Sequence, residues 1–182
     1  AERFGPINGK TDIIEDEFRS KGQLIAPHKT ARKMRKKIGG YIWNRIYTFS
    51  VVRNPWDRFF SMYCYRQKTN RLYADITFEQ YVRDMRDATA DTPGFQRFQW
   101  RYNASDFLTD ENGDLLVDKV VKYEERREGL REVGQRIGFP ELGQAWAQRA
   151  KPEGVHYAEV YTDEMRDIIA RHSARDIELF GY

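Results

Sequence analysis

The sequence predicts an α/β fold in which helices flank a central, mostly parallel sheet. Residues 46–52 form a β-branched and aromatic run, which is typical of a covered parallel strand. An amphipathic helical pattern follows at residues 54–67, and a second strand-like run at 115–123 is again followed by a helical pattern. Because strands alternate with helices along the chain, we expect them to pack in layers.

A basic helix is expected before the first strand, at residues 30–38, where Gly39-Gly40 ends it. The charged face of this basic helix would usually be solvated, but an acidic glycan or a nucleic acid can also dock on such a face. The cations concerned are Lys29, Arg32, Lys33, Arg35, Lys36 and Lys37. A separate, shorter helix is expected at residues 12–18.

The helix after the first strand has a defined start and two faces. Asn54 is a good N-cap, Pro55 suits the first turn, and the helix dipole favours Asp57 there. Spacings of three and four residues separate an apolar stripe from a polar face. The stripe holds Trp56, Phe59, Phe60 and Tyr63, and the polar face holds Arg58, Ser61 and Tyr65.

Arg53 leaves the first strand at its C-terminal edge, beside the start of this helix. In open α/β sheets ligands bind at that edge. Arg53 alone could close the strand end, and Ser61 alone would be an ordinary helix serine. Together with the helix N-terminus, however, an arginine and a serine are suited to a phosphate group.

The later elements follow from capping residues, turn residues and helical periodicity. Thr77 caps a helix at 77–85, residues 87–99 are loop-like, and the turn at 110–114 gives a hairpin-like arrangement between Phe107-Leu108 and the strand at 115–123. Two further helices are expected at 125–137 and 163–180. Their inward residues are Leu130, Val133 and Ile137 in the first, and Met165, Ile168, Ile169 and His172 in the second.

Composition favours one globular domain. The chain has 182 residues, of which 40% are hydrophobic and 14% aromatic, enough for a real core. No apolar run approaches about 18 residues, so we expect no membrane span. The net charge of +3 permits an anionic ligand and is too weak to favour nucleic acid. Cys64 is the only cysteine, so no internal disulfide forms, and three scattered histidines give no metal-ligand spacing.

Residues 46–63 resemble the 3′-phosphate-binding element of sulfotransferases, with its strand, Arg-Asn-Pro corner and downstream serine. The resemblance extends upstream to His28-Lys29-Thr30-Ala31 and downstream to the segments 118–124 and 176–182. It covers the chain from about residue 28 to its last residue. This order is similar to that of the group related to the carbohydrate and heparan 2-O-sulfotransferases.

The resemblance implies a P-loop-kinase-like fold and a PAPS-dependent enzyme. Such enzymes move a sulfuryl group from 3′-phosphoadenosine 5′-phosphosulfate (PAPS) to an acceptor hydroxyl, release 3′,5′-ADP and need no metal. The acceptor would be a carbohydrate, acidic glycans among them, or a small molecule. The protein would mainly position the groups and stabilise developing charge.

The resemblance also assigns roles to residues. Arg53 and Ser61 would hold the 3′-phosphate, and Arg58 would be a further cosubstrate contact. Lys151 and Tyr157 fall near the loop that closes over the nucleotide in related enzymes. His28 occupies the place of the base in heparan 2-O-sulfotransferases, and histidine is the usual base near neutral pH.

One family feature has no counterpart in residues 1–27. Sulfotransferases carry a Pro-Lys-Thr-x-Gly-Thr type of loop after their first strand, which holds the 5′-phosphosulfate. We therefore expect either that residues 1–182 are an N-terminally incomplete domain, with an incomplete sheet beside residues 46–52, or that the protein binds nucleotide without transferring sulfate. A cytoplasmic location is expected, or the Golgi lumen if the chain is part of a eukaryotic enzyme.

Two other functions remain open. The basic helix at 30–38 would serve a nucleotide- or nucleic-acid-binding module without transfer activity, for which a steep salt dependence is diagnostic. A nucleotide kinase is disfavoured, because no Walker lysine or metal-binding aspartate stands out. Residues 5–11 imitate a Walker loop but are one residue short, and no strand precedes them.

Overall fold

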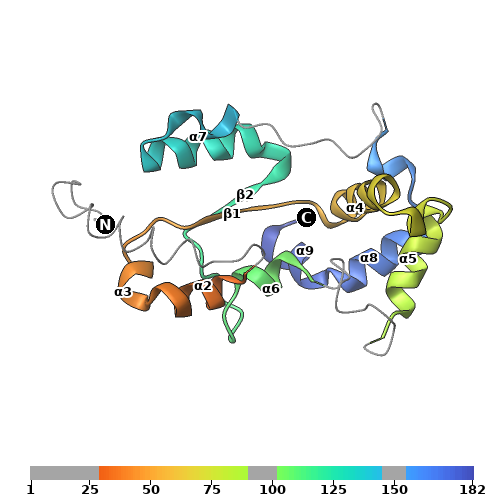
Figure 1. Ribbon diagram of the computed structural model, residues 1–182, viewed down its shortest axis with the longest axis horizontal. Coiled ribbons are helices and arrows are strands. Elements are labelled where there is room, and N and C mark those ends of the chain that lie inside the picture. The colour runs from red at the N-terminus through yellow and green to blue at the C-terminus, as the bar shows by residue number, and fades with distance from the viewer. Residues whose placement is uncertain (1–28, 90–101, 145–154) are drawn as a thin grey trace. The chain divides into compact units, whose positions relative to one another are not determined.

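The computed structural model describes residues 29–89, 102–144 and 155–182 (Figure 1). Contacts divide the chain into two compact units, with residues 1–50 and 105–120 in the first and residues 51–104 and 121–182 in the second. Strands β1 (Phe49–Val52) and β2 (Lys119–Lys122) pair as a two-stranded parallel sheet. The described residues therefore have a mixed α/β structure, as the alternating pattern predicts.

The first unit contains the basic helix. Helix α2 (Ala31–Ile38) begins where expected, with the Thr30 hydroxyl accepting a 3.3 Å bond from the amide of Lys33. Gly39 ends α2 at a φ of 87°, a value that glycine adopts readily, and α3 (Gly40–Trp43) follows at once. A small core forms on one side of both helices from Ala31, Ile38, Ile42 and Trp43, with Met34, Ile46, Leu116 and Val117 against it.

The hairpin-like prediction is confirmed by an antiparallel bridge between Thr109 and Leu115. The Asp110 carboxylate accepts 2.9 Å bonds from the amides of Asn112 and Asp114, which fixes the turn between them. The apolar pair Phe107-Leu108 is not a strand, however. It lies in the helix α6 (Ala104–Leu108).

The second unit is built around a core of three helices, α4 (Pro55–Thr69), α5 (Phe78–Asp87) and α8 (Asp163–His172), which pack against one another (Figure 1). Helices α7 (Arg126–Ile137) and α9 (Ala174–Phe180) complete it, together with the 3₁₀ turns η1 (Arg71–Tyr73), η4 (Tyr123–Glu125), η5 (Pro140–Gln144) and η6 (Tyr157–Glu159). The core contains Phe59, Phe60, Tyr63, Cys64, Phe78, Tyr81, Val82, Met85, Tyr161, Met165, Ile168 and Ile169.

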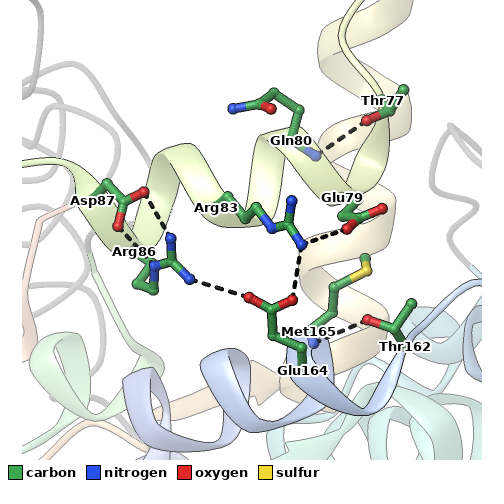
Figure 2. A network of polar contacts seen from close by, with 9 residues as sticks. All are labelled: Thr77, Glu79, Gln80, Arg83, Arg86, Asp87, Thr162, Glu164 and Met165. Atoms are coloured by element: carbon green, nitrogen blue, oxygen red, sulfur yellow. Dashed lines mark hydrogen bonds and ion pairs between the residues drawn. The ribbon is translucent and has the colours of Figure 1, made fainter.

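Charged side chains tie α5 to α8 at the rim of this core (Figure 2). The two carboxylate oxygens of Glu164 accept bonds from different arginines, 2.9 Å from Arg83 and 3.2 Å from Arg86. Arg83 also pairs with Glu79 at 2.7 Å, and Arg86 binds Asp87 through two nitrogens. The network is solvent-exposed, so it adds modestly to the apolar contacts beneath it.

The first strand is shorter than the predicted 46–52 and is not covered on both sides. The amide of Ile46 bonds to the Ile42 carbonyl at 3.2 Å and so continues the α3 turn instead of pairing in the sheet. Val51 is 41% exposed, whereas Val52 is buried. The β-branched run therefore predicted that a strand forms here. It did not predict that the strand begins at Phe49 or that one of its faces is exposed.

Three later expectations need correction. The strand expected at 115–123 is limited to β2, and Ile137, expected to point inward, is 45% exposed. The helix expected at 163–180 is broken at Ser173 into α8 and α9. There the Asn103 side chain donates a 2.9 Å bond to the His172 carbonyl and accepts a 3.1 Å bond from the Ser173 hydroxyl. This tertiary contact explains the break, which helical periodicity does not reveal.

Candidate functional site

The corner between β1 and α4 has the predicted capping geometry. The Asn54 side chain accepts bonds from the amides of Trp56 (3.0 Å) and Asp57 (3.3 Å), and Pro55 occupies the first helical position. Asp57 is buried in the first turn. The first free amides of the helix are thus satisfied by its own cap, so an anion at this corner would rely on nearby side chains and the helix dipole.

The two strands end at the same edge of the sheet, because they are parallel. Arg53 and Asn54 follow β1 there, and Tyr123 and Glu124 follow β2. The Asn54 amide donates a 2.9 Å bond to a carboxylate oxygen of Glu124. The guanidinium carbon of Arg53 lies 4.4 Å from the centre of the Tyr123 ring, and that of Arg126 lies 4.5 Å from the same centre. Two cations and an aromatic ring therefore gather at the C-terminal edge.

Arg53 is held through one nitrogen only. Its Nε donates to Asp57 Oδ2 at 2.5 Å, with exposed fractions of 20% and 9% for the two side chains. No described residue accepts a hydrogen bond from the two terminal nitrogens of Arg53. The ion pair thus orients the guanidinium, while half of its fork stays available for a phosphate oxygen.

Ser61 lies one turn beyond Asp57 on the same side of α4, because the two positions are four residues apart. It is half-buried, and within the described residues its hydroxyl makes no hydrogen bond. The helix therefore brings Ser61 to the side of α4 on which Arg53 meets Asp57. That Arg53 and Ser61 bind one phosphate group together stays a prediction.

Tyr157 also belongs to this part of the second unit. Burial raises the pKa of its hydroxyl, and the negative charges of Asp57 and Glu124 raise it further. Its hydroxyl is thus within electrostatic reach of the two acids of the corner. Beside it, Tyr161 donates a 2.8 Å bond to the Trp56 carbonyl, which joins the segment around η6 to the first turn of α4.

Arg58 has a different environment from Arg53. Its guanidinium donates to the Tyr102 carbonyl at 2.8 Å and to the Asn103 side chain at 3.2 Å, and it lies 4.7 Å from the centre of the Phe59 ring. These contacts join α4 to the segment before α6. The expected cosubstrate contact of Arg58 remains a prediction.

The other predicted site residues, His28 and Lys151, lie outside the described residues. Within residues 29–89, 102–144 and 155–182 no group of three or more His, Cys, Asp or Glu side chains could hold a metal ion. None of the helices described there is long and apolar enough to cross a membrane.

Sequence reasoning missed the contacts that reach the corner from elsewhere in the chain. The i, i+4 spacing of Arg53 and Asp57 was available as a signal, yet Asp57 was considered as an acid of the first helical turn and not as a partner of Arg53. Tyr123 was visible as the last residue of the expected second strand, and Glu124 as the residue after it. Their pairing with the corner depends on strand register, which one sequence does not provide.

Comparisons with known proteins bear on the family of this chain. The family model described as "Sulfotransferase family" matches residues 8–182. A protein of Archaeoglobus fulgidus, described as uncharacterized, is 26% identical over 112 residues, which is 59% of this chain and 81% of that protein. No solved structure matches the chain significantly.

Proposed function

The chain belongs to the sulfotransferase family, and we propose that it transfers a sulfuryl group from PAPS to an acceptor hydroxyl. The observation that supports this most directly is the guanidinium of Arg53 at the C-terminal edge of the sheet, which among the described residues forms a hydrogen bond through Nε only. An arginine oriented in this way is well suited to a phosphate group, and the 3′-phosphate is what distinguishes PAPS from common adenine nucleotides.

In this proposal the corner holds the 3′-phosphate. Arg53 donates hydrogen bonds from its two terminal nitrogens to phosphate oxygens. The positive end of the α4 dipole adds a favourable electrostatic field. Ser61 contributes a hydroxyl from one turn further along. Asp57 keeps Arg53 in place through Nε. Tyr157 and Lys151 contact the cosubstrate from the part of the chain that corresponds to the closing loop of related enzymes. Arg58 either supports α4 or contacts the nucleotide.

The transfer itself places demands on other residues. As the acceptor oxygen forms its bond to sulfur, the bond from sulfur to the 5′-phosphate oxygen breaks, and 3′,5′-ADP leaves. The acceptor hydroxyl must lose its proton in this step, and His28 takes it as general base. Positioning in line and stabilisation of the leaving phosphate supply the rest of the rate.

We extend the same proposal to fold and context. The parallel strands and the phosphate-binding corner support a P-loop-kinase-like arrangement in a single sulfotransferase domain. The acceptor is a hydroxyl-bearing carbohydrate, an acidic glycan among them, or a small molecule. A cytoplasmic location fits the single, buried Cys64.

The test is nucleotide binding, followed by transfer. Titration calorimetry with 3′,5′-ADP and with adenosine 5′-monophosphate should show clear preference for the 3′-phosphorylated nucleotide, and Ser61→Ala should reduce that preference. Radiolabelled PAPS with a panel of carbohydrate and phenolic acceptors then tests transfer. Equal affinity for the two nucleotides would contradict the proposal.

A second candidate function rests on α2. Lys33, Arg35 and Lys36 are exposed and have no acidic partner within the described residues, so their charge is available to a polyanion. A nucleic-acid- or glycan-binding module would use this face. Binding of a fluorescent oligonucleotide that weakens steeply with salt, and is lost when the three residues become Gln, would favour it.

A further inference from the structure

Both carboxylate oxygens of Glu124 are used in the second unit. One accepts the 2.9 Å bond from the Asn54 amide, and the other accepts a 3.2 Å bond from the hydroxyl of Tyr182. Because Asn54 is the residue directly after Arg53, the first bond fixes the peptide plane that joins them. Glu124 therefore connects Tyr182 to the backbone that carries Arg53.

Tyr182 is itself held in place by the end of α9. Gly181 has a φ of 67°, and the amides of Gly181 and Tyr182 both donate to the Ile177 carbonyl, at 2.9 and 3.1 Å. Lys122, the last residue of β2, donates a 2.9 Å bond to the Gly181 carbonyl and lies 4.9 Å from the centre of the Tyr182 ring. The strand that leads to Glu124 thus also holds the tyrosine that binds it.

We propose that Glu124 and Tyr182 are positioning residues for the nucleotide, holding the Arg53–Asn54 corner in its anion-binding geometry. This inference rests on the proposed 3′-phosphate site. Tyr182 acts through Glu124, and Glu124 acts through the Asn54 amide, so neither needs to touch the nucleotide.

A carboxylate beside an anion site repels the ligand, and here two donors are directed at the oxygens of the Glu124 carboxylate. Burial and the adjacent Glu124 charge raise the pKa of Tyr182, so its hydroxyl keeps its proton and remains a donor at neutral pH.

The decisive variant is Tyr182→Phe, which removes the hydroxyl and keeps the ring. We expect the Kd for 3′,5′-ADP to rise roughly three- to tenfold, less than the loss of a direct bond to a charged group, because Tyr182 acts through Glu124. The Kd for adenosine 5′-monophosphate should stay the same, since that nucleotide does not use the corner. Tyr41→Phe is the matched control, because Tyr41 is 67% exposed in the first unit.

Glu124 provides a second and independent test. Glu124→Gln keeps an oxygen for the Asn54 amide and should retain most of the preference for 3′,5′-ADP. Glu124→Ala leaves that amide without its acceptor and should lose most of it. If Glu124→Gln keeps the preference that Glu124→Ala loses, the role of Glu124 is to position the Asn54 amide, and its negative charge is not required.

The outcomes separate this inference from the proposed function. A wild-type protein that binds the two nucleotides equally overturns the proposed function itself. A wild-type preference that Tyr182→Phe and Glu124→Ala both retain overturns the positioning role alone. Equal losses for both nucleotides in Tyr182→Phe also overturn it, because they indicate a general structural effect. If Glu124→Ala does not fold, Tyr182→Phe decides.

Discussion

The guanidinium of Arg53 lies over the ring of Tyr123, 4.4 Å from its centre. Arg53 follows β1 and Tyr123 follows β2, so the contact exists only because the two strands run parallel and end together. In α/β sheets this edge is where ligands bind. The geometry of the candidate site therefore depends on strand register as much as on the Arg-Asn-Pro sequence.

Replacing Arg53 should weaken binding of the 3′-phosphorylated nucleotide selectively. Arg53→Ala removes a charge-assisted bond, which costs about tenfold or more in affinity for 3′,5′-ADP. Arg53→Lys keeps the charge but loses the planar guanidinium. Its affinity for 3′,5′-ADP should therefore lie between those of wild type and Arg53→Ala. Calorimetry with 3′,5′-ADP and adenosine 5′-monophosphate measures the effect. Equal losses for both nucleotides would remove the 3′-phosphate assignment.

His28→Ala tests the general base. In a protein with transfer activity, kcat should fall by roughly 10²–10⁴ because the acceptor proton has no base in the transition state. The Kd for 3′,5′-ADP should change little, since a base does not hold the cosubstrate. Steady-state kinetics with PAPS and separate nucleotide titrations give the two quantities. Lost nucleotide binding with intact turnover would make His28 a binding or structural residue.

Much of the fold was predictable where a local signal decides the structure. The predicted caps Asn54 and Thr77 both hydrogen-bond to the amides expected of them. The amphipathic stripe of α4 is buried at Phe59, Phe60 and Tyr63 as its spacing predicts. These features depend on residues within one or two turns, so a single sequence contains the necessary information.

The features that were missed depend on distant contacts. The break at Ser173 comes from the Asn103 side chain, and the start of β1 is set by Ile46 bonding back to Ile42. At the candidate site, the Arg-Asn-Pro sequence and the helix that follows it were enough to name Arg53 and Ser61 as candidate residues. Glu124 and Tyr182 could not, because their contacts with the corner arise from sheet register and from the position of α9.

Acid should remove the contribution of Glu164 to stability. Its hydrogen bond from Arg83 and the nearby arginine charges hold the pKa of Glu164 below its usual value of 4.5 (Figure 2). A lowered folded-state pKa means that the stabilisation is present above the unfolded pKa and is lost as pH falls through the folded value. Glu164→Gln should therefore be slightly less stable than wild type at pH 7 and equal to it in strong acid.

Urea unfolding at neutral and acidic pH, each at low and high salt, measures this difference. The gap should also shrink in high salt, since the network is exposed. Glu178→Gln is the matched control, because Glu178 is an exposed acid without a described partner. A gap that persists in strong acid would show that the carboxylate charge is not responsible.

A side chain at Gly129 should lower the stability of the protein, although alanine favours helices more than glycine does. A Cβ at Gly129 in α7 would lie 2.5 Å from a methyl of Val121 in β2. Overpacking of this kind costs about 1–3 kcal/mol, more than the gain of up to about 1 kcal/mol from replacing a helical glycine. Gly40→Ala is the control, since nothing lies within 4 Å of its Cβ position.

Urea unfolding of both glycine variants checks this expectation. Gly129→Ala should unfold at lower urea concentration than wild type, and Gly40→Ala should not. Adding Val121→Ala to Gly129→Ala should recover part of the loss, because the clashing methyl groups are then gone. Destabilisation by Gly40→Ala as large as that by Gly129→Ala would show that the approach of α7 to β2 is not the cause.

Asp57 should matter for stability more than for nucleotide selectivity. Asp57→Ala leaves the mostly buried Arg53 without its carboxylate, at a cost of about 1–3 kcal/mol. For a chain of this length that lowers the melting temperature by roughly 2–4 °C per kcal/mol. Asp57→Asn keeps an acceptor oxygen for Nε and should lose less.

The same variant distinguishes orientation of Arg53 from its charge. Arg53 remains in Asp57→Ala, and the phosphate can replace the missing carboxylate as its counter-charge, so the preference for 3′,5′-ADP should be reduced by the lost orientation but should fall less than in Arg53→Ala. At the same concentration, 3′,5′-ADP should accordingly raise the melting temperature of Asp57→Ala more than that of Arg53→Ala, since binding to the native state stabilises it. If Asp57→Ala instead loses the preference as fully as Arg53→Ala does, the ion pair is what makes Arg53 competent to bind.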